Sequence, residues 1–170
     1  DFSLHAGEGT IFRHDVVGVL GENGIGKTSF VKELVAGDEG EAELEPNETI
    51  SKLELSFKPQ YLQYDGEDIV QLVLEKAKKY DLQLMRPLEL EGLMNHQLKD
   101  LSGGELQRVM IAKTLAEDAH LYVLDEPSAY LDVEQRLSLS KVIRDMMEVK
   151  KASALVIDHD LLFIDHIAKR

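Results

Sequence analysis

Residues 21–28 read Gly21-Glu22-Asn23-Gly24-Ile25-Gly26-Lys27-Thr28, a match to the pattern G-x-x-x-x-G-K-[ST]. A β-branched apolar run within residues 11–20 precedes this stretch, and apolar residues at helical spacing follow it in residues 28–35. Glycines let successive backbone N–H groups and a helix N-terminus point at phosphates, while Lys27 neutralises phosphate charge and the Thr28 hydroxyl ligates Mg²⁺. We therefore expect residues 21–29, ending in Ser29, to bind the phosphates of a nucleotide.

A second candidate site follows the apolar run at residues 121–124, where Asp125 and Glu126 stand at the end of a predicted strand. In nucleotide hydrolysis the first acid of such a pair holds Mg²⁺, often through water, and the second faces the water beside the γ-phosphate. Taken alone, an acidic pair after a strand is more often charge at a helix N-terminus. Together with the loop at residues 21–28, the pair predicts Asp125 as a metal ligand and Glu126 as the general base.

A third motif, Leu101-Ser102-Gly103-Gly104-Glu105, places a glycine loop before an apolar-faced helix predicted at residues 105–119. Ser102 and the backbone amides after it can form a second anion site at the helix N-terminus. In isolation, a plain helix cap explains the same residues equally well.

The rest of the pattern alternates strands with helices. Strands are predicted at residues 52–57, 121–124 and 154–157, a helix begins near Glu67, and a second short helix begins at Pro87. An amphipathic helix lies between the last two strands, with Leu139, Val142, Ile143, Met146 and Met147 as its apolar face. This alternation predicts an α/β fold, a mainly parallel sheet flanked by helices with its ligand beyond the carboxyl ends of the strands.

Length and composition favour one domain. The chain has 170 residues and 44% hydrophobic content, enough for one sizeable core. Because 32 Asp and Glu residues outnumber 19 Lys and Arg residues, the surface offers no general attraction to a nucleic-acid backbone. The absence of cysteine excludes disulfides and iron–sulfur ligation within this chain. A cytoplasmic location fits that absence. No apolar run is long enough to span a bilayer, so we expect a soluble protein without a membrane partner.

The sequence pattern at both ends of the domain expected over residues 1–170 lies within a predicted element. Strand-like alternation is already under way at Asp1, and Arg170 falls within a helical pattern. We therefore expect a nucleotide-binding domain that is incomplete at both ends, with some antiparallel strands near its N-terminus and a small helical subdomain at about 63–103.

The third motif also carries a family resemblance, because phosphate loops in general lack such a segment. Leu101-Ser102-Gly103-Gly104-Glu105-Leu106-Gln107-Arg108 resembles the signature of the ATP-binding cassette ATPases. Other elements of that family follow in its order. Gln60 after Lys58-Pro59 resembles the Q-loop, Ser128-Ala129-Tyr130-Leu131-Asp132 the D-loop, and His159 in Asp158-His159-Asp160 the switch histidine. The resemblance implies a P-loop NTPase fold with ATP and Mg²⁺ as cofactors.

The same resemblance implies roles for single residues. Catalysis would rest on Lys27, Gln60, Glu126 and His159, with Gln60 reaching Mg²⁺ and the attacking water and His159 contacting the γ-phosphate. Without the resemblance, a lone histidine at a strand end is more often structural. The implied Mg²⁺ ligands are Thr28, Gln60 and Asp125. Ser102, Gly103, Gly104 and Asp132 would act across a dimer, because ATP in this family is enclosed when two cassettes meet head to tail.

Within the ATP-binding cassette ATPases, the residues of these motifs are most similar to those of the RNase L inhibitor family of ribosome-recycling ATPases. The D-loop tyrosine, Tyr130, and the opening Asp-Phe-Ser-Leu resemble the second cassette of that family. This implies a twin-cassette protein with an N-terminal iron–sulfur domain, which splits ribosomes with ATP. Its partners would be a second cassette, the small ribosomal subunit and release or translation factors. The family's adenine-stacking aromatic is missing from its usual place, although Phe2 could substitute for it.

Two other readings stay open. An ATPase subunit of a membrane transporter would need a groove in the insert between Gln60 and Leu101, which is short here. A non-hydrolysing structural cassette would carry long coiled coils between its motifs, and the sequence has no sustained heptads there.

Overall fold

A computed structural model describes residues 11–12, 14–21, 29, 54–60, 64 and 66–168 of the chain. Within these ranges the sheet has four parallel strands in the order β1-β4-β3-β2. The strands are β1 (Val16–Leu20), β2 (Leu55–Lys58), β3 (Leu121–Asp125) and β4 (Ser153–Asp158). The predicted α/β fold with a mainly parallel sheet is confirmed. The antiparallel strands expected near the N-terminus lie outside the described residues.

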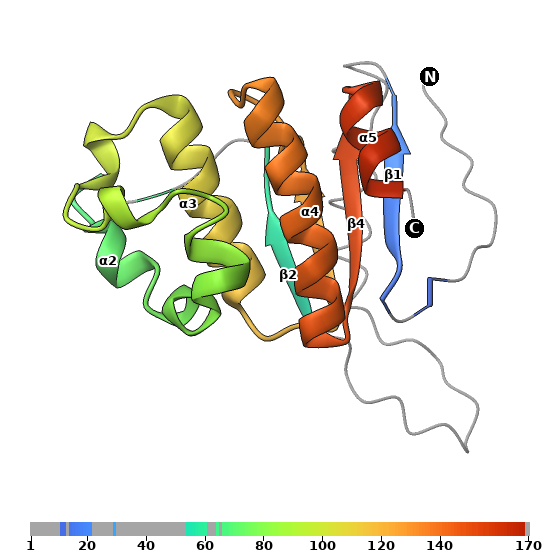
Figure 1. Ribbon diagram of the computed structural model, residues 1–170, viewed down its shortest axis with the longest axis horizontal. Coiled ribbons are helices and arrows are strands. Elements are labelled where there is room, and N and C mark those ends of the chain that lie inside the picture. Colours follow the sequence, from blue (N-terminus) through green and yellow to red (C-terminus); the bar gives the residue numbers. More distant parts are fainter. Residues whose placement is uncertain are drawn as a thin grey trace.

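Three longer helices cover one face of this sheet. They are α3 (Gly103–Ala116), α4 (Val133–Lys150) and α5 (Leu161–Ala168), and Figure 1 shows α4 and α5 side by side in front of the strands. Short helical segments lie between β2 and α3, to the left in Figure 1. These are α2 (Val70–Val73), a 3₁₀ turn at Lys76–Tyr80, a π turn at Asp81–Met85, and 3₁₀ turns at Glu91–Leu93 and Leu98–Asp100.

The strands carry apolar side chains on both faces, as buried parallel strands do. Because successive side chains of a strand point to opposite faces, Tyr122 and Leu124 of β3 join the main core beneath the helices. Val123 points the other way and packs with Leu155 and Ile157 of β4 in a second cluster. The sheet is therefore held through both of its faces.

Helix starts follow local capping. Ser102 and Asp132 each form a reciprocal capping box with the residue three positions later, which fixes the first turns of α3 and α4. The apolar face predicted for the second of these helices is confirmed, since all five of its residues are buried, Met146 and Met147 completely. The chain after the signature segment thus follows the sequence pattern closely.

One predicted helix was wrong in detail. A single helix from about Glu67 was expected to bury a face of Ile69, Val73, Ala77 and Tyr80. The structure breaks this stretch into α2 and two short turns, and Ile69 is 40% exposed while Val70 and Leu74 are fully buried. Within residues 66–168, no helix begins at Pro87 either. The boundaries of the helical subdomain, about 63–103, remain a prediction.

Among the described residues, no helix combines the length and apolar character needed to cross a bilayer.

Candidate functional site

The four parallel strands bring their carboxyl ends to one edge of the sheet. The register pairs Leu20 with Asp158, Asp125 with Ile157 and Lys58 with Leu124, so the four ends lie level with one another. Each end is followed by a residue that the sequence singled out, which are Gly21, Gln60, Glu126 and His159. A parallel sheet binds its ligand at this edge.

Gln60, Glu126 and His159 converge there. Gln60 Nε2 donates a hydrogen bond of 2.8 Å to Glu126 Oε2, and His159 Nδ1 lies 3.9 Å from Glu126 Oε1. Gln60 and Glu126 are 66 positions apart in the sequence, so only the sheet order unites them. The carboxylate of Glu126 is thus flanked on one oxygen by Gln60, expected to reach Mg²⁺ and the attacking water, and on the other by His159, expected to contact the γ-phosphate. Their catalytic roles remain a prediction.

The backbone of Glu126 is held in an uncommon conformation. Its φ is +47°, in the left-handed region that residues with a side chain rarely adopt. Its N–H donates to the Ile157 carbonyl at 2.8 Å, which ties it to β4. Gln107 of α3, almost fully buried, donates from Nε2 to the carbonyls of Glu126 at 2.9 Å and Pro127 at 3.0 Å. Contacts of this kind are what maintain a strained backbone at a functional site.

Lys58 lies behind the acidic residues and is 1% exposed. Its Nζ donates to the Asp125 carbonyl at 3.0 Å and to the Pro59 carbonyl at 3.2 Å. Burial lowers the pKa of Lys58 to about 8, and the negative charges of Asp125, Asp158 and Glu126 oppose that shift. The side chain is therefore protonated at neutral pH.

Asp158 fixes the loop after β4 to the loop after β3. Its fully buried carboxylate accepts hydrogen bonds from the Ser128 N–H at 3.1 Å and the Ser128 hydroxyl at 2.9 Å. It also accepts from the N–H groups of His159 at 2.8 Å and Asp160 at 3.0 Å. The predicted D-loop and switch histidine therefore share one buried anchor.

Sequence reasoning assigned no role to Lys58, Gln107 or Asp158, although all three lie inside the motifs that it quoted. Each of them touches backbone groups of the candidate site, and a side chain that binds carbonyl or N–H groups leaves no spacing pattern. The place of Lys58 at the end of a predicted strand, directly before Pro59-Gln60, was the one available signal for it.

The signature segment packs on the D-loop. The Ser102 hydroxyl donates to Glu105 Oε2 at 2.6 Å, and these hydrogen bonds from Ser102 hold the pKa of the Glu105 carboxyl below its usual value. A Cβ atom on Gly104 would lie 2.8 Å from the Tyr130 carbonyl oxygen, and one on Gly103 would lie 3.4 Å from the Tyr130 ring. Gly104 is thus required by close approach. Ser102 caps α3 in the structure, as the helix-cap interpretation predicts. The role of Ser102 in an anion site remains a prediction.

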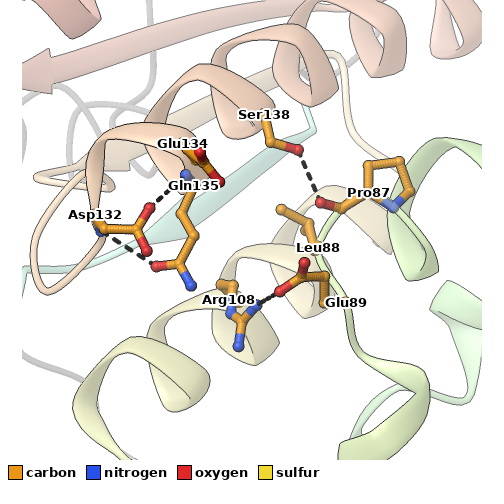
Figure 2. Close-up of a pocket in the computed structure, with 8 residues that line it drawn as sticks. All are labelled: Pro87, Leu88, Glu89, Arg108, Asp132, Glu134, Gln135 and Ser138. Carbon is orange, nitrogen blue, oxygen red and sulfur yellow. Dashed lines mark hydrogen bonds and ion pairs between the residues drawn. The ribbon is translucent and has the colours of Figure 1, made fainter.

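Asp132 caps α4, accepting from the Gln135 N–H at 2.8 Å. Beside it lies a polar pocket between α3, α4 and the turn before residue 90 (Figure 2). In this pocket Arg108 Nη1 donates to Glu89 Oε2 at 2.8 Å, and the Ser138 hydroxyl donates to the Pro87 carbonyl at 2.8 Å. These contacts attach α3 and α4 to the turn that joins the short helical segments at Asp81–Met85 and Glu91–Leu93. The role of Asp132 across a dimer is a prediction that these contacts do not test.

Most of the phosphate loop lies outside the described residues, including Glu22, Asn23, Gly24, Ile25, Gly26, Lys27 and Thr28. Gly21 follows β1 directly, and Ser29 is helical and exposed. The donors that are described suit Mg²⁺, because the Asp125 carboxylate and the Gln60 amide are oxygen ligands at the strand ends. In the described ranges no three His, Asp or Glu side chains gather as a protein-only metal site. Mg²⁺ commonly uses one or two carboxylates together with nucleotide phosphates.

Comparison with known proteins supports this arrangement. The ABC transporter family model matches residues 4–129. An uncharacterised ABC transporter ATP-binding protein of Methanocaldococcus jannaschii is 49% identical over 100% of this chain and 29% of its own length. A solved RNase-L Inhibitor structure has a TM-score of 0.78 at 45% identity, covering 92% of this chain and 31% of that one.

A further solved structure shows the archaeal ribosome recycling factor aABCE1 in complex with the archaeal ribosomal stalk protein aP1. It matches with a TM-score of 0.79 and 45% identity over 93% of this chain and 31% of that chain. The chain spans less than a third of the length of these relatives. The expected resemblance to the RNase L inhibitor and ribosome-recycling branch is confirmed. The chain belongs to the family that the ABC transporter model describes, and it is an ATP-binding cassette ATPase domain.

Proposed function

We propose that this cassette hydrolyses Mg-ATP only when a second cassette closes over it, and that this closure serves ribosome recycling. The observation that carries the hydrolytic part of the proposal is the convergence of Gln60 and His159 on the two carboxylate oxygens of Glu126. ATP hydrolysis is general to the family. The requirement for a partner cassette and the ribosomal role are our inferences.

The chemistry assigned to this arrangement is general-base hydrolysis. Glu126 accepts the proton of the water that attacks the γ-phosphate, and the Gln60 amide holds the carboxylate in a fixed orientation. His159 Nδ1 lies 3.9 Å from the other carboxylate oxygen. In our proposal His159 contacts the γ-phosphate and Lys27 neutralises the β- and γ-phosphates. Mg²⁺ would be held by Thr28, Gln60 and Asp125 and would supply charge neutralisation for the phosphate oxygens.

The need for a second cassette follows from the place of the signature segment. Ser102 caps a different helix from the one that follows the phosphate loop, and the next two residues, Gly103 and Gly104, pack closely on Tyr130 of the D-loop. In our proposal, the Ser102 loop and Asp132 face the ATP of a second cassette, which then joins the two domains. Hydrolysis removes the γ-phosphate charge that attracts both helix N-termini, and the pair opens. This cycle of closing and opening does mechanical work on a bound partner.

The ribosomal assignment rests on the relatives and on the sequence of the motifs. By resemblance, the second cassette lies in the same complete protein, together with an iron–sulfur domain N-terminal to both. The proposed partners are the small ribosomal subunit and release or translation factors in the cytoplasm. A transporter subunit is the alternative, and it makes an opposite prediction about where the protein is found.

Cosedimentation separates these assignments. The protein from its complete reading frame is incubated with a non-hydrolysable ATP analogue and centrifuged with small ribosomal subunits through a sucrose gradient. We expect nucleotide-dependent comigration with the subunits, and loss of comigration in Ser102→Arg, which blocks closure without touching the phosphate loop of the same chain. The proposal would be overturned if the protein were recovered with a membrane permease. It would also be overturned if its migration in the gradient changed neither with the nucleotide nor with the Ser102→Arg substitution.

A further inference from the structure

Lys58 is a buried charge that the hydrolysis scheme above does not use. It is the last residue of β2, two positions before Gln60, and is 1% exposed. Moving an ammonium group out of water costs several kcal/mol unless hydrogen bonds and opposite charges compensate. An apolar side chain of similar length would avoid that cost. The contacts of the ammonium therefore indicate what it contributes.

Those contacts join two elements. Lys58 Nζ donates to the carbonyl of Asp125, the last residue of β3, and to the carbonyl of Pro59, next to Gln60. The distances are 3.0 Å and 3.2 Å, which are good hydrogen bonds. One ammonium thus links the residue before Glu126 to the residue before Gln60. The next residues of the two segments, Gln60 and Glu126, are themselves joined by the hydrogen bond of 2.8 Å.

The surroundings also favour a positive charge. Asp125 and Asp158 are fully buried and Glu126 is 9% exposed, so three carboxyl groups gather at this edge of the sheet. Carboxylates gathered at one strand edge repel one another, and the repulsion is strong where water is excluded. An ammonium group hydrogen-bonded to the Asp125 carbonyl reduces that repulsion.

We propose that Lys58 is a positioning residue for ATP hydrolysis, whose ammonium ties the Gln60 turn to the end of β3 and so sets the Gln60–Glu126 pair. This inference rests on the proposed function, since it concerns the assigned general base. Lys58 acts through Gln60 and Glu126 and does not itself touch the reacting atoms.

The test is a set of matched variants in the hydrolysing protein. Lys58→Met removes the charge and both hydrogen bonds while keeping the length of the side chain. Lys113→Met removes an exposed lysine from the same groove beside β2 and serves as the control. We expect Lys58→Met to lower kcat about 10- to 100-fold with little change in KM, as misplacement of a catalytic pair does. Lys113→Met should match the parent, and Lys58→Arg, which keeps the charge, should recover part of the loss.

A double-mutant cycle distinguishes positioning from a general loss of structure. If Lys58 acts through the pair, Lys58→Met should cost less than about threefold in a Gln60→Ala background, because the pair is already broken. The full 10- to 100-fold loss in that background, or a parental kcat for Lys58→Met, would refute the role.

A spectroscopic readout keeps the inference separate from the proposed function. In the nucleotide-free protein, the NMR signals of the Gln60 side-chain amide report its hydrogen bond to Glu126, whether or not the protein hydrolyses ATP. Lys58→Met should shift these signals toward those of a solvated glutamine, with thermal unfolding as the check on folding. Unshifted Gln60 signals would refute the positioning role even if the protein is an active ATPase. Shifted signals in a protein without ATPase activity would support it while the proposed function fails.

Discussion

Glu126 combines a left-handed backbone with a carboxylate that accepts a hydrogen bond from Gln60 on one oxygen and has His159 Nδ1 3.9 Å from the other. The φ of +47° turns its side chain out of the line of β3, so Asp125 and Glu126 can serve different tasks although they are adjacent. Its N–H is fixed by Ile157 and its carbonyl by Gln107. The orientation of Glu126, our proposed general base, therefore depends on backbone contacts as well as on Gln60.

We expect Glu126→Gln to retain ATP binding and to slow turnover by about 10² to 10⁴, because the amide preserves shape but cannot accept the proton. Binding is followed with a fluorescent ATP analogue and turnover by phosphate release. Glu75→Gln, an exposed site on the helical segments, is the matched control. Parental turnover in Glu126→Gln would remove Glu126 from the role of base.

Gln107→Leu tests the support of that backbone. The variant leaves the carbonyls of Glu126 and Pro127 without their buried donor, a loss of about 1–3 kcal/mol in unfolding free energy. Urea unfolding at equilibrium gives the change, and Gln71→Leu on the exposed side of α2 is the control. If Gln107→Leu is as stable as the parent, the two hydrogen bonds do not hold the turn.

At the scale of elements, α5 begins directly after the switch histidine. Asp160 accepts a hydrogen bond from the Phe163 N–H at 3.0 Å and forms an ion pair with Arg136 of α4. The helix cap and, to a smaller degree, the arginine hold the pKa of Asp160 below its ordinary value. The cap thus fixes the loop that carries His159 to both α4 and α5.

Asp160→Ala should cost about 0.5–2 kcal/mol in unfolding free energy at pH 7, the usual loss for a helix cap. Because the folded-state pKa is depressed, the contribution of Asp160 is present above its unfolded pKa and is lost as the pH falls through the folded pKa. The gap between variant and parent should therefore narrow below about pH 4. Asp145→Ala, in the exposed middle of α4, provides the baseline. A gap independent of pH would contradict the capping account.

The sequence predicted most elements correctly where one pattern was available. Residues 121–125 and 153–158 are apolar runs bounded by polar residues, and α4 has one clear apolar face. The stretch after Glu67 has apolar residues on several sides, with Val70 and Leu74 at the same spacing as Ile69 and Val73. In the folded protein Val70 and Leu74 are the buried pair, and the helix is interrupted. The spacing of apolar residues along the sequence does not determine which pair is buried.

The same limit applies to the candidate site. Gln60, Glu126 and His159 could be named because their motifs are recognisable, and the parallel order of the strands explains why they meet. Lys58 bonds to a carbonyl 67 positions away and Gln107 to carbonyls 19 and 20 positions away. Such partners depend on the register of β2 with β3 and on the docking of α3. They become visible only in three dimensions.

At the scale of the whole molecule, the two predicted anion sites are built on different elements. The phosphate loop follows β1, whereas Ser102 caps α3, whose first two residues, Gly103 and Gly104, pack on the D-loop. In our account each ATP is enclosed by the phosphate loop of one cassette and the Ser102 segment of another. A single cassette therefore holds only half of each composite site.

The most direct test of this central claim is the ATPase rate of the 170-residue chain as a function of its concentration, with the association state followed by sedimentation velocity. We expect weak Mg-ATP binding and only background hydrolysis from the monomer, with turnover per chain rising as chains associate or when a second cassette is added. Ser102→Arg should bind nucleotide as the parent does and should not show that rise. Robust turnover that is independent of concentration, from a species shown to be monomeric, would contradict the two-cassette mechanism.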